Sequence, residues 1–215
     1  EHPVTELVTG LDLVELMIRV ANGEKLPIKQ SDIKLKGWAL EARVYAEDPF
    51  RNFLPSTGRL VRYVPPAENA NVRVDTGVYE GGEISVFYDP MIAKLCTYGA
   101  DRKEATAHMR NALDAYYIRG VSHNIPFLAS LMGKTRFEEG RLTTNFIAEE
   151  YPDGFSEKDL PAKDPSRLLA VAALVHAAYA RRAAGITGQI PGHGRDVPEN
   201  WIVAEGDRQH HVWVA

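Results

Sequence analysis

The sequence predicts an α+β fold, made mainly of an antiparallel sheet with flanking helices and followed by a long buried helix. Three observations support this prediction. Residues 38–45 alternate between apolar and polar side chains, and further strand-like segments follow after short connections. Helical patterns occur on both sides of this region, over residues 12–22 and after Asp101. An Ala- and Leu-rich run then fills residues 168–180.

Composition limits the classes of function. The chain has 215 residues, 45% of them hydrophobic, which is enough for one large or two small domains. A net charge of -4 gives no general attraction for nucleic acid or anionic membranes, so we expect neither as a partner. The single cysteine, Cys96, excludes an internal disulfide and fits a reducing compartment. Because the chain opens at Glu1 without an initiator methionine, we expect it to be part of a longer polypeptide.

The chain divides into two unequal parts. Residues 1–150 mix helical and strand-like segments, with Gly, Pro, Asn and Asp marking the turns between them. The stretch that follows combines Pro and Gly with several charges, which is typical of a linker. We therefore predict a first domain over residues 1–150, a linker over 151–163 and a second domain over 164–215.

The first predicted helix spans residues 12–22. Gly23 follows it as a stop signal. Its apolar side chains share one face of the helix: Leu13, Val14, Met17, Ile18 and Ala21.

The predicted sheet begins with residues 38–45. Apolar side chains point to one side of this strand, whereas Glu41, Arg43 and Tyr45 point to the other. Arg43 is therefore expected on the polar face. Gly81-Gly82 interrupts the later part of the region, where further strands are predicted over residues 59–64, 72–75, 84–87 and 93–98.

Helices are predicted after the sheet. Asp101, with Glu104 three residues on, resembles a capping box. Apolar residues recur at helical spacing after it, so this helix is expected to lie on the sheet. Pro126 suits the first turn of a second helix, and Thr144 is a candidate cap for a third.

Residues 168–180 form the longest predicted helix, and it is apolar on every side. Such a helix must be surrounded by lipid or by protein. The run is shorter than the roughly 20 residues needed to cross a bilayer. We therefore expect burial within protein.

Four motifs of the chain, in this order, resemble biotin carboxylases of the ATP-grasp superfamily. EHPVTE at residues 1–6 is similar to the end of their bicarbonate-binding segment. EARVYAEDP at 41–49, FLPSTG at 53–58 and YDPMIAKL at 88–95 resemble their C-terminal domain. LLAVAAL at residues 168–174 resembles the central helix of a domain that joins carboxylase to carboxyltransferase in propionyl-CoA carboxylase α subunits. In that family a β-barrel wraps the helix.

The resemblance implies two catalytic, substrate-binding residues. Glu1 would be the general base that deprotonates bicarbonate, so that carbonate can attack the γ-phosphate of ATP and give carboxyphosphate. Arg43 would face the ureido oxygen of biotin and stabilise the enolate formed as N1′ loses its proton. From the residues alone, Glu1 can also be an ordinary exposed carboxylate. Arg43 can also be half of a surface ion pair with Glu41 or Glu47.

For the other candidate site residues we expect structural roles. Tyr88 and Asp89 lie in a matched motif, but a turn before Pro90 explains an aspartate without chemistry. His210 and His211 are adjacent, yet no histidine spacing fits a metal site, so no metal ligand is assigned.

The resemblance also implies cofactors and partners. ATP and Mg²⁺ would bind to residues upstream of this chain, and biotin would be attached elsewhere, since no Ala-Met-Lys-Met sequence occurs here. The partners would be a biotin carrier domain and a carboxyltransferase β subunit, with propionyl-CoA as the final acceptor and methylcrotonyl-CoA as the alternative. The compartment would be the cytoplasm in a bacterium and the mitochondrial matrix in a eukaryote. This chain alone should be inactive, and a non-catalytic assembly scaffold is the rival interpretation.

Overall fold

The computed structural model describes residues 3–85, 87–160, 165–188, 190, 192 and 194–214. The chain forms two compact units, Glu1–Pro161 and Ala162–Ala215, and each is described here by itself. The division falls within the stretch that the sequence predicts as a linker. Tyr151 and Phe155, also in that stretch, are buried in the first unit, where their rings pack against Phe127.

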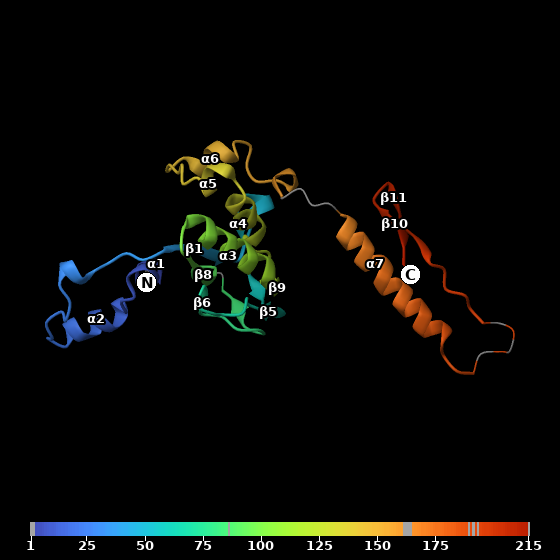
Figure 1. Cartoon of the computed structure of the whole chain (residues 1–215), viewed down its shortest axis with the longest axis horizontal. Coiled ribbons are helices and arrows are strands. Elements are labelled where there is room, and N and C mark those ends of the chain that lie inside the picture. The colour runs from blue at the N-terminus through green and yellow to red at the C-terminus, as the bar shows by residue number, and fades with distance from the viewer. Residues whose placement is uncertain are drawn as a thin grey trace. The chain divides into compact units, whose positions relative to one another are not determined.

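The first unit mixes helices with short strands (Figure 1), as the α+β prediction requires. Its α-helices are α1 (Pro3–Thr9), α2 (Leu13–Ala21), α3 (Arg102–Ala115), α4 (Ile125–Met132), α5 (Thr135–Glu138) and α6 (Phe146–Glu150). The described residues also form the 3₁₀ turns η1 (Gln30–Asp32), η2 (Pro49–Arg51) and η3 (Glu157–Asp159). The strands are β1 (Trp38–Tyr45), β2 (Glu47–Asp48), β3 (Leu54–Pro55), β4 (Gly58–Arg59), β5 (Arg62–Val64), β6 (Val72–Thr76), β7 (Glu83–Ile84), β8 (Met91–Gly99) and β9 (Tyr117–Arg119).

The main sheet has three antiparallel strands in the order β1-β8-β6. β1 pairs with β8 from Trp38 opposite Gly99 onward, and the register shifts between Val44 and Tyr45. Both β1 and β6 are edge strands of this sheet. The smaller antiparallel pairs are β2-β3, β4-β7 and β5-β9.

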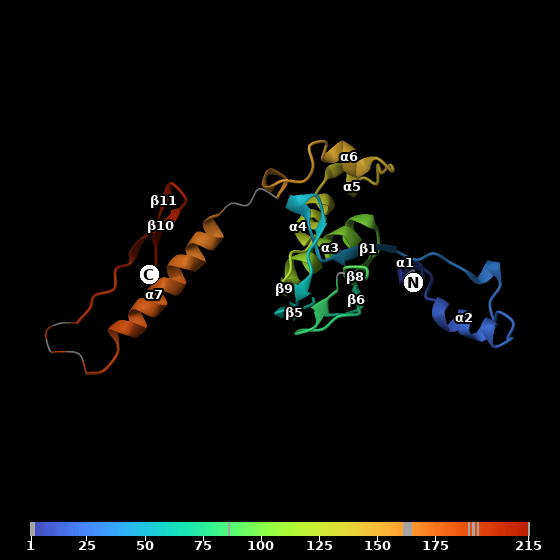
Figure 2. The ribbon, with the colours of Figure 1, turned by 180° about the vertical axis from the view of Figure 1, so that it is seen from behind.

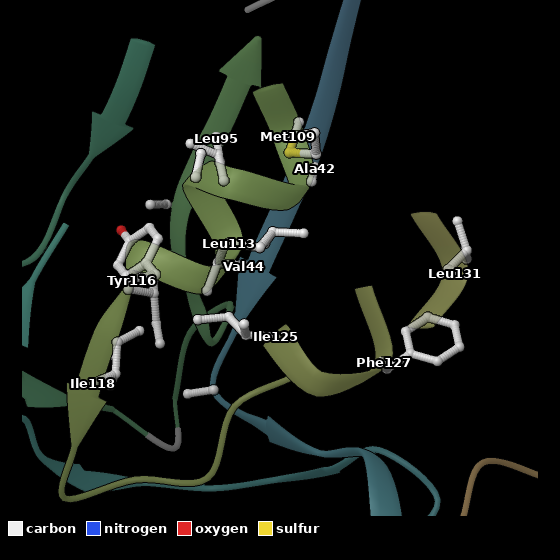
Figure 3. Packing of buried hydrophobic residues seen from close by; sticks show 14 of the residues in the cluster. Ala42, Val44, Leu95, Met109, Leu113, Tyr116, Ile118, Ile125, Phe127 and Leu131 are labelled. Atoms are coloured by element: carbon white, nitrogen blue, oxygen red, sulfur yellow. The ribbon is translucent and has the colours of Figure 1, made fainter. Parts of the chain in front are cut away.

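The core lies between this sheet and α3. Figure 3 shows Met109 and Leu113 of α3 pointing toward Ala42 and Val44 of β1, and all four side chains are at most 3% exposed. This is the apolar face that the alternation of residues 38–45 predicts. Thr97 of β8 adds a buried hydrogen bond on the same side, because its hydroxyl donates to the carbonyl of Ala105 at 2.9 Å.

Local signals define the ends of the helices. The carboxylate of Asp101 accepts from the backbone N–H of Glu104 at 2.9 Å, so it caps α3 as predicted. The Glu104 carboxylate, however, accepts from the N–H of Ala100 rather than from that of Asp101. α4 carries Pro126 in its first turn, as predicted. The prediction of Thr144 as a cap is wrong, because Asn145 occupies the N-cap position of α6.

Two strand predictions need correction. The predicted strand 59–64 is two strands, because Leu60 N–H bonds to Gly82 at 2.8 Å whereas Val61 N–H bonds to Arg119 at 2.8 Å. The predicted strand 84–87 ends at Ile84. Beyond it the N–H of Phe87 donates to the hydroxyl of Ser85 at 3.1 Å, a local side-chain bond in place of a ladder bond.

The helix predicted over residues 12–22 forms as α2. Asp12 caps its start, and Gly23 follows with φ 86°, a conformation that favours glycine. No residue of α2 is buried, and Met17 is 71% exposed. The apolar face of α2 is therefore open to solvent in the described part of the chain.

The second unit contains α7 (Ser166–Ala184) and a hairpin of β10 (Asn200–Glu205) and β11 (Arg208–Trp213). The hairpin lies beside α7 in both views (Figures 1 and 2). It buries Ala173 and Ala177 against Val214, but Leu168, Val171, Leu174 and Tyr179 are more than half exposed. A β-barrel around α7 therefore stays a prediction. None of the described helices is long and apolar enough to cross a membrane.

Candidate functional site

Arg43 lies near the C-terminal end of β1, on the face of the sheet opposite α3, as the sequence predicts. Its side chain is 51% exposed, and its Nε donates to Oε1 of Glu41 at 3.2 Å. Hydrogen bonding to Tyr45 and to Glu41 raises the pKa of Arg43 above its ordinary value. The guanidinium is thus a permanent cation, half open to solvent, on a regular strand.

Two rows of mainly charged residues run across the polar face of the sheet, and Arg43 belongs to the first. Lys94 of β8 is the cross-strand partner of Arg43, and Asp75 of β6 is the partner of Lys94. One residue pair further along, Glu41, Cys96 and Arg73 form the parallel row. The polar face therefore carries both signs of charge, with Arg43 and Lys94 side by side.

Helix α1 is fixed to this polar face. Glu6 of α1 accepts from Nη1 of Arg73 at 2.9 Å through Oε2, and from the N–H of Leu13 at 3.0 Å through Oε1. The Arg73 interaction is the largest cause of the lowered pKa of Glu6. Pro3, at the start of α1, is buried. One carboxylate thus ties α1 to both β6 and α2.

Glu1 lies outside the described residues, although it precedes the buried Pro3 by only two positions. The convergence of Glu1 and Arg43 on one cleft therefore stays a prediction. The structure does show that α1 is held on the sheet face that carries Arg43.

A cleft of about 820 Å³ opens beside the charged rows. Lys94 and Asp75 line it together with Tyr88 and Asp89 of the fourth matched motif. Asp89 has a structural role, as predicted, because its Oδ1 accepts from the N–H of Met91 at 3.0 Å and closes a turn. Asp89 also contributes to the raised pKa of Glu47, whose main cause is burial.

Sequence reasoning missed Asn124. Its side chain bonds to the backbone of β1 at Arg43 and Tyr45, with Nδ2 donating to the Arg43 carbonyl at 3.1 Å and Oδ1 accepting from the Tyr45 N–H at 2.9 Å. The sequence does hold a weaker signal, because an Asn before Ile125-Pro126 is typical of a helix N-cap. That signal points to α4 and not to the site.

The described residues give little evidence for a nucleophilic cysteine or a metal site. Cys96 is fully buried, and burial raises the pKa of its thiol to about 12, so it is not an accessible thiolate. No group of three or more His, Cys, Asp or Glu in the described part of the chain could hold a metal ion.

The sequence profile of the biotin carboxylase C-terminal domain matches residues 41–149, and that of the propionyl-coenzyme A carboxylase BT domain matches residues 168–215. The profile of the ATP-binding domain of the carbamoyl-phosphate synthase L chain matches residues 1–29. Because the first match covers half of the chain, the chain belongs to the biotin carboxylase C-terminal domain family.

Curated relatives narrow this class. The propionyl-CoA carboxylase alpha chain of Ruegeria pomeroyi is 52% identical over 222 residues, which cover 94% of this chain and 33% of the relative. The mitochondrial methylcrotonoyl-CoA carboxylase subunit alpha of Mus musculus is 46% identical over 164 residues, which cover 76% of this chain and 23% of the relative. The chain thus spans a third or less of the length of these relatives.

Solved structures agree with this fold. The biotin carboxylase domain of the Hydrogenobacter thermophilus 2-oxoglutarate carboxylase, in complex with MgADP, ADP and bicarbonate, matches with a TM-score of 0.68 and 41% identity. The match covers 73% of this chain and 35% of that chain.

Proposed function

We propose that the chain is the C-terminal part of the biotin carboxylase component of an acyl-CoA carboxylase. In this role the complete protein is a ligase that uses ATP and bicarbonate to carboxylate carrier-bound biotin at N1′. The observation that carries the proposal is the position of Arg43, a half-exposed cation on the polar face of a strand that lies within the matched family profile.

Arg43 would act on the ureido group of biotin. As N1′ gives up its proton to the phosphate that is released when carboxyphosphate decomposes to CO₂, negative charge moves onto the ureido oxygen, and a guanidinium that is already in place would stabilise this charge without reorganising. N1′ then forms its new bond to the carbon of CO₂. The exposure of the Arg43 side chain supports this role, because a half-exposed guanidinium can reach a substrate that approaches from solvent.

Glu1 would act on the other substrate. A carboxylate is a weak base for bicarbonate, so the transfer needs neighbouring cations that stabilise the carbonate dianion as it forms. Carbonate would then attack the γ-phosphorus of ATP, releasing ADP and giving carboxyphosphate, the source of CO₂. The anchoring of α1 through Glu6 supports this role, because it holds the segment that follows Glu1 in the sequence on the sheet face that carries Arg43.

The nucleotide and its Mg²⁺ would be held by residues that the relatives carry beyond this chain. Mg²⁺ would supply charge neutralisation on the phosphates. The bound MgADP and bicarbonate of the similar 2-oxoglutarate carboxylase domain support both substrates. Biotin would arrive on a carrier domain, outside residues 1–215.

The second unit would join the carboxylase to its carboxyltransferase β subunit, and that partner would choose the acyl-CoA. Propionyl-CoA is favoured because the profile over residues 168–215 is that of the propionyl-coenzyme A carboxylase BT domain. The relative that acts on methylcrotonoyl-CoA has lower identity and coverage. We propose boundaries at 1–150, 151–163 and 164–215, and a matrix or cytoplasmic location according to the host.

One observation favours the rival function, a non-catalytic assembly scaffold. The outer side of α7 is apolar and exposed in the described part of the chain, which suits a helix that contacts other protein. Both functions can coexist in one chain, so the experiment must separate them.

The test uses the intact protein with its partner subunit. Arg43→Ala and Glu1→Ala should each reduce carboxylation of free biotin by at least about 100-fold, because each removes charge stabilisation or proton transfer in the reacting complex. Replacing Leu169, Val171 and Leu174 with Gln should abolish co-purification with the carboxyltransferase and leave free-biotin carboxylation nearly intact. Arg182→Ala on the same helix is the control. Near-normal turnover in both single variants would refute the proposed catalytic roles.

A further inference from the structure

Asn124 makes three hydrogen bonds to the edge of β1. Its Nδ2 donates to the carbonyl of Arg43 at 3.1 Å, and its Oδ1 accepts from the N–H of Tyr45 at 2.9 Å. The backbone N–H of Asn124 donates to the carbonyl of Tyr45 at 3.1 Å. Asn124 is separated from these residues by about eighty positions in the sequence. A single residue therefore imitates a neighbouring strand at this point.

The backbone atoms that Asn124 binds would otherwise lack partners within the sheet. β1 is an edge strand, so the N–H and C=O groups on its outer side have no strand beside them. The register of β1 also shifts between Val44 and Tyr45, one residue beyond Arg43, and such an irregularity weakens the ladder locally. Arg43 thus lies one residue before an irregular point in the pairing of β1 with β8.

Asn124 is itself held from the other side. It is 6% exposed and occupies the N-cap position of α4, where its carbonyl accepts from the N–H of Leu128 at 3.0 Å. The next residues of α4, Ile125 and Phe127, belong to the main core. Asn124 therefore transmits the rigidity of a packed helix to the edge of β1.

We propose that Asn124 is a positioning residue for biotin carboxylation, which fixes the backbone of Arg43 so that its guanidinium meets the ureido oxygen of the substrate. This inference rests on the proposed function of Arg43. The juxtaposition that carries it is the double hydrogen bond from the Asn124 side chain to Arg43 and Tyr45.

The ion pair with Glu41 is too weak to do this alone. Arg43 is half exposed, and exposed pairs contribute little orientation because solvent competes for both charges. The carboxamide of Asn124 acts on backbone atoms in a buried position, where hydrogen bonds restrict motion more effectively. A displacement of about 1 Å in a reacting group can cost about 100-fold in rate, so even a small movement of β1 should be measurable.

The experiment measures kcat and KM for free biotin in the intact protein carrying Asn124→Ala or Asn124→Asp. Asn124→Asp keeps the size of the side chain and an acceptor for the Tyr45 N–H, but it cannot donate to the Arg43 carbonyl. Bicarbonate-dependent ATP cleavage without biotin is measured in parallel, because it does not require Arg43 to meet the ureido group.

Ser130→Ala is the matched control. Ser130 lies on the same helix, is also 6% exposed, and bonds to the hydroxyl of Tyr151 at 3.0 Å and to the carbonyl of Asp159 at 2.6 Å. Within the described part of the chain its hydrogen bonds do not reach β1, so Ser130→Ala reports on the packing of α4 without a direct effect on Arg43. Thermal unfolding of each variant is recorded, and kinetics are measured well below the lowest midpoint.

We expect Asn124→Ala to lower kcat for biotin by about 10- to 100-fold, with ATP cleavage changed by less than about 2-fold. Asn124→Asp should also lower kcat for biotin, because it places a carboxylate oxygen against the Arg43 carbonyl without a proton to donate, and it decides the question if Asn124→Ala does not fold. Loss of biotin turnover in Asn124→Ala and Asn124→Asp no larger than in Ser130→Ala would overturn the positioning role. Arg43→Ala with normal turnover would instead refute the proposed function itself.

Discussion

The carboxylate of Glu6 offers a direct test of how the polar face is assembled. Its two oxygens bind different elements, Arg73 of β6 at 2.9 Å and the N–H of Leu13 at the start of α2 at 3.0 Å. Glu6→Gln removes the ion pair but keeps an oxygen that can accept from Leu13. Glu6→Ala removes both interactions. Comparing the two variants therefore separates the contributions of the two oxygens.

The magnitudes follow from exposure. The Glu6 side chain is 15% exposed and that of Arg73 is 40% exposed, so the pair is partly screened and Glu6→Gln should destabilise α1 by about 1 kcal/mol. Losing the acceptor for the Leu13 N–H should add about 1 kcal/mol in Glu6→Ala. The control is Glu15→Gln, whose pair with Arg19 within α2 is exposed and screened by solvent, so its loss should matter less than that of the Glu6 pair.

Hydrogen exchange of peptides covering residues 3–21 in the intact protein is the assay, because it reports local opening without requiring two-state unfolding. The pKa of Glu6 is lowered in the folded state, mainly by Arg73. Its stabilisation is therefore complete above the ordinary glutamate pKa of about 4.3 and is lost as pH falls through the lowered folded value. Glu6→Gln should lack this acid dependence. Equal protection in Glu6→Gln and Glu15→Gln at neutral pH would refute the tether.

Two further outcomes follow from burial. Leu113 is 2% exposed between α3 and the sheet, so Leu113→Ala should lower the free energy of unfolding of the first unit by about 2–5 kcal/mol in chemical denaturation. A loss no larger than that of a substitution at an exposed position would contradict the packing described. Because burial raises the pKa of Cys96 to about 12, its thiol should resist alkylation by iodoacetamide at pH 8 until the protein is unfolded. Rapid labelling of the native protein would show that solvent reaches Cys96.

The elements that local patterns define could be predicted from the sequence. The alternation over residues 38–45 placed β1 within its observed bounds and put Arg43 on the polar face. Asp101 identified the start of α3, because a cap acts within one turn of its own helix. The motifs that identified the family are likewise local, because each is a short continuous segment of the sequence.

The remaining features depend on contacts between distant parts of the chain. Nothing near Leu60 and Val61 shows that their N–H groups bond to different segments, so one strand was predicted where two exist. Glu6 and Arg73 are 67 positions apart, and Asn124 binds β1 across a similar distance. A single sequence gives no means of pairing such residues. Glu1 lies outside the described residues, so its relation to Arg43 stays a prediction.

The carboxamide of Asn124 on the edge of β1 also has a consequence for assembly, apart from the role proposed for it in catalysis. On the opposite edge of the sheet, the N–H of Val74 in β6 donates to the carboxylate of Glu68 at 2.9 Å. Both borders of the sheet thus have backbone groups that are already occupied by side chains. A foreign extended peptide could not add there without displacing them, which protects a small sheet from intermolecular strand addition and from aggregation through it.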